Sequence, residues 1–95
     1  EIKAREYENS GFYLTCFPNP FAESIEIGYK NKEPGFVELT IYNQLGQPVD
    51  KLINQAQGKG MQKVTWNASD LPSGIYYLRL QSGIQTATTK IILSK

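Results

Sequence analysis

VELTIYNQLGQPV, from Val37 to Val49, is the stretch that decides the fold class. Its first half alternates, because the apolar residues Val37, Leu39 and Ile41 are each followed by another residue, Glu38, Thr40 and Tyr42. A period of two places one face of a β-strand in a core and the other face in water. The tetrapeptide NQLG follows, and Gly46 can adopt the positive φ that ends a tight turn. The stretch therefore predicts two strands joined by a short turn.

The same alternation and similar turn signals recur along the rest of the chain. Pro18 and Pro20 lack N–H donors, so FPNP is expected to form a bend or an edge. Ser82-Gly83 fits a two-residue hairpin. The predicted strands lie near residues 11–17, 23–30, 35–43, 47–53, 61–67, 74–81 and 84–93. Short strands with regular turns predict an all-β fold, an immunoglobulin-like antiparallel β-sandwich of about seven strands.

Length and composition exclude several classes of function. The 95 residues fit one domain, and a net charge of +1 argues against a nucleic-acid-binding surface. No apolar run is long enough to span a membrane. The chain has one Cys and no His, so it lacks the usual zinc ligands and the usual general base. We therefore expect no catalytic residue, no metal site and no cofactor, and the domain is not expected to be an enzyme.

The first ten residues, EIKAREYENS, differ from the remainder in charge. They contain five charged side chains within eight residues and no initiator Met, which indicates a flexible linker within a processed or longer protein. We expect residues 1–10 to be a linker and residues 11–95 to be the folded domain. An exposed first strand on such an arm also predicts a strand-swapped homodimer.

Aromatic residues allow two interpretations. Trp66, Tyr42, Tyr76 and Tyr77 can form a platform that stacks on sugars, or they can supply core volume, which is the commoner role in so small a sandwich. Cys16, in a predicted strand, is expected to be a buried core residue.

Two further local patterns are expected to be structural. Asn67-Ala68-Ser69 matches a glycosylation acceptor but is expected to be a turn. Asp50 and Asp70 are too isolated to form a calcium site.

Four motifs, taken in order, resemble the type A C-terminal sorting domain of the type IX (Por) secretion system of Bacteroidota. FPNPF (Phe17 to Phe21) resembles the opening YPNP element, with Phe in place of Tyr. VELTIYNQLGQPV resembles the central strand–turn–strand, and Trp66-Asn67 with LPSGIY (Leu71 to Tyr76) resembles the W(D/N)…LPSGxY element. TKIILSK (Thr89 to Lys95) resembles the terminal strand. The resemblance starts at Gly11.

This resemblance implies a secretion signal. Family members direct a fused cargo protein from the periplasm through an outer-membrane translocon to the cell surface. A sortase-like peptidase often cleaves them off, and residues 1–10 would be the cleavage region. The implied partners are the type IX translocon and shuttle proteins and that peptidase.

The resemblance also suggests where the translocon binds. The last strand can lie at a sheet edge and pair with a receptor by strand addition. Ile91 and Leu93 are expected to face the core. The candidate recognition residues are Lys90, Ile91, Ile92, Leu93, Ser94 and Lys95, and the motif residues with structural roles are Pro18, Asn19, Pro20, Gly46, Gly74 and Tyr76.

Two other functions remain open at this point. A carbohydrate-binding accessory domain is favoured by the aromatic residues, and a structural immunoglobulin-like spacer is compatible with the same strands. In the structural interpretation, Lys90 only guards an edge strand against aggregation and the isoleucines beside it only pack.

Overall fold

A computed structural model describes residues 5–7 and 12–95, and this part of the chain contains strands and no helix. Its eight strands are β1 (Arg5–Tyr7), β2 (Phe12–Phe17), β3 (Ser24–Asn31), β4 (Gly35–Tyr42), β5 (Pro48–Gln57), β6 (Gly60–Asn67), β7 (Gly74–Ser82) and β8 (Gln85–Leu93).

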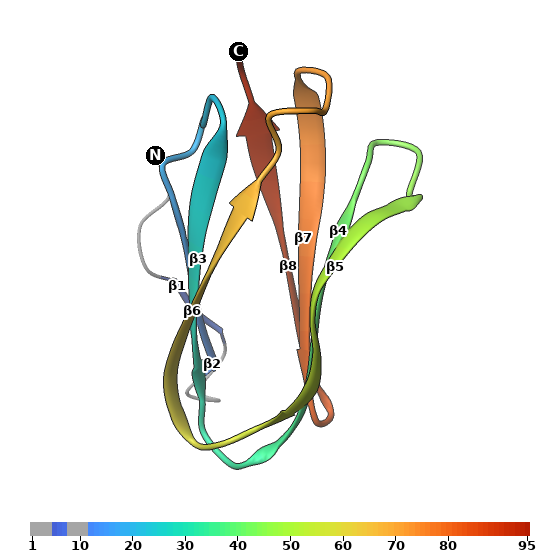
Figure 1. Cartoon of the computed structure of the whole chain (residues 1–95). Helices are drawn as coiled ribbons and strands as arrows, with labels where there is room; N and C mark the ends of the chain where they lie inside the picture. The colour runs from blue at the N-terminus through green and yellow to red at the C-terminus, as the bar shows by residue number, and fades with distance from the viewer. Residues whose placement is uncertain (1–4, 8–11) are drawn as a thin grey trace.

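The strands form two four-stranded antiparallel sheets, ordered β1-β2-β3-β6 and β5-β4-β7-β8. The sheets face each other (Figure 1), so the predicted immunoglobulin-like sandwich is confirmed. Strands β2 to β8 correspond to the seven predicted strands. β1 is additional. It lies inside the segment expected to be a linker, residues 1–10, and pairs with β2. Residues 1–4 and 8–10 of that segment lie outside the described residues.

The core lies between the inner faces of the two sheets. On β7 and β8 the buried residues alternate with exposed or half-buried ones, as the sequence period requires, and β3 does the same except at Gly28, which is buried between Ile27 and Tyr29. The first sheet contributes Leu14, Cys16, Ile25, Ile27, Tyr29 and Trp66, and the second contributes Val37, Leu39, Ile41, Ile53, Tyr76, Leu78, Leu80, Ala87, Ile91 and Leu93. The expected core position of Cys16 is therefore confirmed.

Strand β5 departs from the prediction in length and in regularity. It continues to Gln57, whereas the expected strand ended at residue 53. Its pairing with β4 shifts register twice, once between Leu39 and Thr40 and once between Ile41 and Tyr42. Each shift adds an unpaired residue to β5 and reverses its side-chain direction, so the strand shows no clean period of two.

The β7–β8 hairpin is displaced by one residue from the predicted turn. Ser82 pairs with Gln85, so the two turn residues are Gly83 and Ile84 rather than Ser82 and Gly83. Gly83 has a φ of 62°, a conformation that suits the first central position of a tight hairpin turn and that Gly adopts without a Cβ penalty.

Trp66 connects the two sheets through its polar atom. The indole is buried on β6, and its Nε1–H donates a 2.9 Å hydrogen bond to Oδ2 of Asp50 on β5. A buried indole N–H without a partner would be costly, so Asp50 allows the large ring to lie inside the sandwich.

We predict that Asp50→Ala lowers the free energy of unfolding by about 1–2 kcal/mol, because it removes the acceptor of the Trp66 indole. Asp50→Asn keeps an acceptor and should cost less. Denaturant unfolding followed by the fluorescence of the single Trp measures both, with the exposed Asp70→Ala as control. Equal stability of Asp50→Ala and the unchanged protein would contradict the role of this hydrogen bond.

Tyr29 makes a second connection between the sheets. Its ring is fully buried on β3, and its hydroxyl donates a hydrogen bond to Oε1 of Gln57 at the end of β5. Burial raises the pKa of Tyr29 above its ordinary value, and the hydrogen bond to Gln57 partly opposes this rise. The neutral phenol is thus favoured by folding.

Stability should consequently fall at alkaline pH through Tyr29. Its contribution is complete below the unfolded-state pKa of about 10 and is lost as the pH rises through the higher folded-state pKa. We predict that Tyr29→Phe flattens this alkaline decline, although it costs about 1 kcal/mol at neutral pH. Urea unfolding between neutral and alkaline pH tests this, with the exposed Tyr77→Phe as control. Parallel pH profiles for all three proteins would count against it.

Candidate functional site

Three motifs that are far apart in the sequence meet at one end of the sandwich, beside the C-terminus (Figure 1). The β2–β3 connection carries FPNPF, the β6–β7 connection carries LPSG, and β8 ends between them. Asn19 and Phe21 contact the last residues of the chain. We call Asn19, Phe21 and the segment Lys90 to Ser94 the terminal clip.

Asn19 binds β8 with both ends of its side-chain amide. Its Nδ2 donates to the carbonyl oxygen of Lys90 at 3.1 Å, and its Oδ1 accepts from the N–H of Ile92 at 2.9 Å. The side chain therefore takes the place of a neighbouring strand along β8. Asn19 is only 6% exposed, so these two bonds satisfy an amide that would otherwise be buried at a cost.

Phe21 continues the same contact through its backbone. Its N–H donates to the carbonyl oxygen of Ile92 at 2.9 Å, and its carbonyl accepts from the N–H of Ser94 at 2.8 Å. These bonds form a parallel bridge between Phe21 and Leu93. Pro18 and Pro20, both preceded by cis peptide bonds, flank Asn19. Since neither proline has an N–H to offer, Asn19 and Phe21 supply the polar contacts of the motif.

An aromatic cluster lies under the clip and joins three motifs. The ring centroids of Phe21 and Trp66 are 5.9 Å apart. Those of Trp66 and Tyr76 are 5.8 Å apart, in an edge-to-face arrangement. The Tyr76 hydroxyl donates to the carbonyl oxygen of Pro72 at 2.7 Å, which holds the LPSG turn against the cluster. Aromatic pairs of this geometry stabilise beyond their buried area, so the motifs form one structural unit.

The final residue contacts the β6–β7 connection. The backbone N–H of Lys95 donates to Oγ of Ser73 at 3.1 Å, and its Nζ donates to the carbonyl oxygen of Ser69 at 2.6 Å. Asn67 shapes this connection, because its Oδ1 accepts from the N–H of Ser69 at 2.9 Å. The expectation that Asn67-Ala68-Ser69 forms a turn is confirmed.

The structure divides the candidate recognition residues between the core and the surface. Ile91 and Leu93 are buried, as expected, and Ile92 is half-buried. Lys90, Ser94 and Lys95 are exposed. A partner that binds the folded domain therefore reaches Lys90, Ser94 and Lys95, together with part of Ile92, but not Ile91 or Leu93.

The structural motif residues do not all belong to the clip. Gly74 pairs with Leu93 at the start of β7, and Tyr76 lies in the aromatic cluster. Gly46 lies in the β4–β5 turn, and its φ of 81° is the positive value predicted for the end of that turn. Figure 1 shows this turn at the right, apart from the connections that carry the other motifs. The N–H of Gly46 donates to the Asn43 carbonyl, so Gly46 shapes a turn and contributes nothing to the clip.

Strand β8 is an edge strand with an outer edge that is only partly covered. The atoms that the clip contacts belong to Lys90 and Ile92, so alternate residues of β8 direct their backbone groups away from β7. Along the same edge, Thr86, Thr88 and the N–H of Lys90 have no strand partner in the described part of the chain. The open stretch thus ends where Asn19 begins to contact β8.

Other arrangements suggested by the sequence are separated by the fold. Trp66 and Tyr76 are buried in the core, whereas Tyr42 and Tyr77 pair on the outer face of the second sheet. The four rings therefore do not form one platform, because the inner and outer faces of a sheet alternate along each strand.

Residues 5–7 and 12–95 contain no cluster of three or more His, Cys, Asp or Glu side chains and no helix suited to cross a membrane.

Sequence reasoning missed the contact between the first and last motifs. It treated Asn19 as a structural residue of a bend, and it placed Phe21 and Ser73 in motifs without predicting that either contacts the end of the last strand. The available signal was an Asn held between two prolines, since such a segment cannot form a ladder by itself and its amide must find partners elsewhere.

The chain matches a family model described as the secretion system C-terminal sorting domain over residues 15–94, from β2 to the end of the clip. Searches of curated proteins and of solved structures found no match. Because the match covers more than four-fifths of the chain and contains the whole sandwich from β3 onward, the chain belongs to the C-terminal sorting domain family of the type IX secretion system.

Proposed function

We propose that this domain directs a fused cargo protein through the outer-membrane type IX translocon to the cell surface, and that the translocon or its shuttle proteins recognise the end of β8 in its folded state. The observation that carries the proposal is the terminal clip, in which Asn19 and Phe21 hold residues 90–94 by four hydrogen bonds. Cargo with this domain travels through the periplasm.

A partner can read two features of this region. The open edge from Thr86 to Lys90 offers backbone groups for strand addition that no described strand pairs with, and the side chains of Lys90 and Lys95 add positive charge beside it. The clip fixes the backbone of Lys90 through Asn19, and Ser73 fixes the backbone of Lys95, so both lysines have defined positions. We infer that acidic groups of the partner meet these lysines.

Proteolytic removal of the domain would take place near its N-terminus, at the other end of the sequence from the terminal clip. A sortase-like peptidase would cleave within residues 1–10, before the first core strand, since a protease needs an extended segment in its cleft. β1 lies in this segment as an outer strand of its sheet, and its short pairing with β2 also supports a strand-swapped homodimer in which β1 is exchanged between copies.

Export should fail when the clip cannot form. We predict that a periplasmic reporter fused to residues 1–95 reaches the surface of a Bacteroidota strain with an active type IX system. A fusion that lacks Ile91–Lys95 should stay in the periplasm. Asn19→Ala should reduce surface reporter by about tenfold or more, and a tenfold loss corresponds to ~1.4 kcal/mol of binding free energy between the domain and its partner. Protease shaving measures surface reporter.

The matched control for this experiment is Asn54→Ala, an exposed Asn on β5. Circular dichroism of each purified domain separates loss of recognition from loss of folding. Unchanged export of both the truncated fusion and Asn19→Ala would reject recognition of the terminal strand and leave a structural spacer as the better interpretation.

Charge at the end of β8 should matter separately from the clip. Lys90 bonds Asn19 only through its carbonyl, so Lys90→Glu keeps the clip and reverses the exposed charge. We predict about tenfold less surface reporter for Lys90→Glu, because like charges across an interface repel. Lys59→Glu, an exposed lysine in the β5–β6 turn, is the control and should export normally. Equal export of the two variants would exclude acidic partner groups at Lys90.

A further inference from the structure

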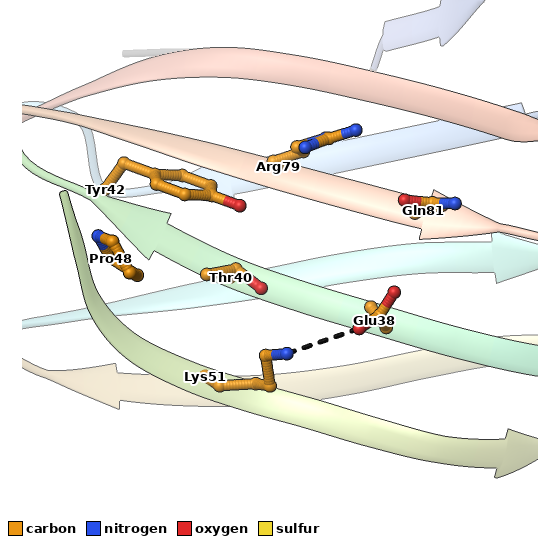
Figure 2. Close-up of a pocket in the computed structure, with 7 residues that line it drawn as sticks. All are labelled: Glu38, Thr40, Tyr42, Pro48, Lys51, Arg79 and Gln81. Carbon is orange, nitrogen blue, oxygen red and sulfur yellow. Dashed lines mark hydrogen bonds and ion pairs between the residues drawn. The ribbon is translucent and has the colours of Figure 1, made fainter. Parts of the chain in front are cut away.

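The outer face of the second sheet contains a hollow of about 280 Å³ whose lining comes from β4, β5 and β7 (Figure 2). We call it the sheet hollow. Thr40 lies at its centre, and the side chains of Tyr42, Lys51, Arg79 and Gln81 surround it. It lies on the face opposite the core and does not include any residue of the terminal clip.

Thr40 is unusual for a residue on an outer face. It is only 6% exposed, because its neighbours on β4, β5 and β7 rise around it. Its backbone belongs to the central ladder, yet its hydroxyl makes no hydrogen bond with any described residue of the chain. A buried hydroxyl without a partner carries a desolvation cost that a ligand or a water can remove.

The charge around the hollow is unbalanced. Glu38 is paired with Lys51, whose Nζ lies 3.2 Å from Oε2 of Glu38. Arg79 faces Thr40 across the β4–β7 pairing and has no ion pair among the described residues. One guanidinium, which can donate two parallel hydrogen bonds to a carboxylate, is therefore left without an anion.

We propose that the sheet hollow binds a sugar that carries a carboxylate, of the uronic acid class. The Arg79 guanidinium binds the carboxylate, the Thr40 hydroxyl and the Gln81 amide bond the ring hydroxyls, and the Tyr42 ring contacts the apolar face of the sugar. The volume lies just below the roughly 300–1,000 Å³ of pockets for larger ligands, so it suits a single sugar unit.

The position of the hollow favours a sugar over an acidic peptide. An extended peptide gains affinity by pairing with open backbone groups at a sheet edge. β4 is paired with β5 on one side and with β7 on the other, so the face above Thr40 offers side chains only. A ring with hydroxyl groups in several directions matches such a surface.

The test is an NMR titration of the ¹⁵N-labelled 95-residue domain with glucuronic acid, glucose, acetate and a blocked diglutamate peptide. We expect glucuronic acid to bind with a dissociation constant on the order of 1 mM and to shift the amides of Thr40, Arg79 and Gln81. Glucose and acetate should each bind about tenfold more weakly, since each supplies half of the contacts.

Three variants link the binding to the named groups. Arg79→Gln removes the charge, Arg79→Lys keeps the charge but loses the two-pronged donor, and Thr40→Val removes only the hydroxyl. Arg79→Gln and Thr40→Val should each weaken glucuronic acid about tenfold, with Arg79→Lys between Arg79→Gln and the unchanged protein. Lys63→Gln, on the other sheet, should have no effect.

Several results would overturn the proposal. Equal binding of acetate and glucuronic acid would indicate a simple anion site, and tighter binding of the diglutamate peptide would indicate a peptide surface. Unchanged affinity in Thr40→Val would mean that a water fills the hollow. Absence of binding up to tens of millimolar would also reject the site. Thermal unfolding of each variant shows whether a loss of glucuronic acid binding comes from misfolding. If Arg79→Gln or Thr40→Val is misfolded, the affinity of Arg79→Lys relative to the unchanged protein decides: a weaker affinity supports the site, and an equal affinity rejects it.

Discussion

The binding of the end of β8 by the β2–β3 connection is the interaction on which the candidate functional end of this domain depends. β8 lies at an edge of its sheet, and its final residues have a hydrogen-bonded strand on one side only. The Asn19 amide and the Phe21 backbone supply four bonds on the other side. Without these four bonds, the outer edge of β8 would expose its backbone groups along the whole strand. Such exposure makes edge strands prone to fraying and to unwanted pairing.

The clip also explains why motifs that are distant in sequence occur together. Phe21 is at once a backbone partner of β8 and a ring of the cluster with Trp66 and Tyr76. The Tyr76 hydroxyl in turn fixes the LPSG turn, whose Ser73 contacts the last residue. Each motif thus supports the position of the next, and they meet where the chain leaves β8.

The domain separates its two candidate surfaces by layer. The terminal clip occupies an edge and one end of the sandwich, whereas the sheet hollow lies on the outer face of β4 and β7. Arg79 and Tyr42 contribute to the second surface because the strand period turns them away from the core, in the same way that it buries Leu39 and Leu80. A single alternation therefore provides both the core and an outer face on which charge can be left unpaired.

The sequence by itself determined the all-β class, the approximate limits of seven strands and the inward direction of residues such as Val37, Leu78 and Ile91, because a period of two is a local property of the backbone. It also determined the family, since the motifs occur in order. It did not predict the bulged course of β5, the one-residue displacement of the β7–β8 turn, or the burial of Thr40 on an outer face. Those features, and the bonding of Asn19 to a strand 71 residues away, were decided by the tertiary structure. The physical reason is that a hydrogen bond between distant segments depends on how the two sheets pack, and no local pattern of residues records that distance.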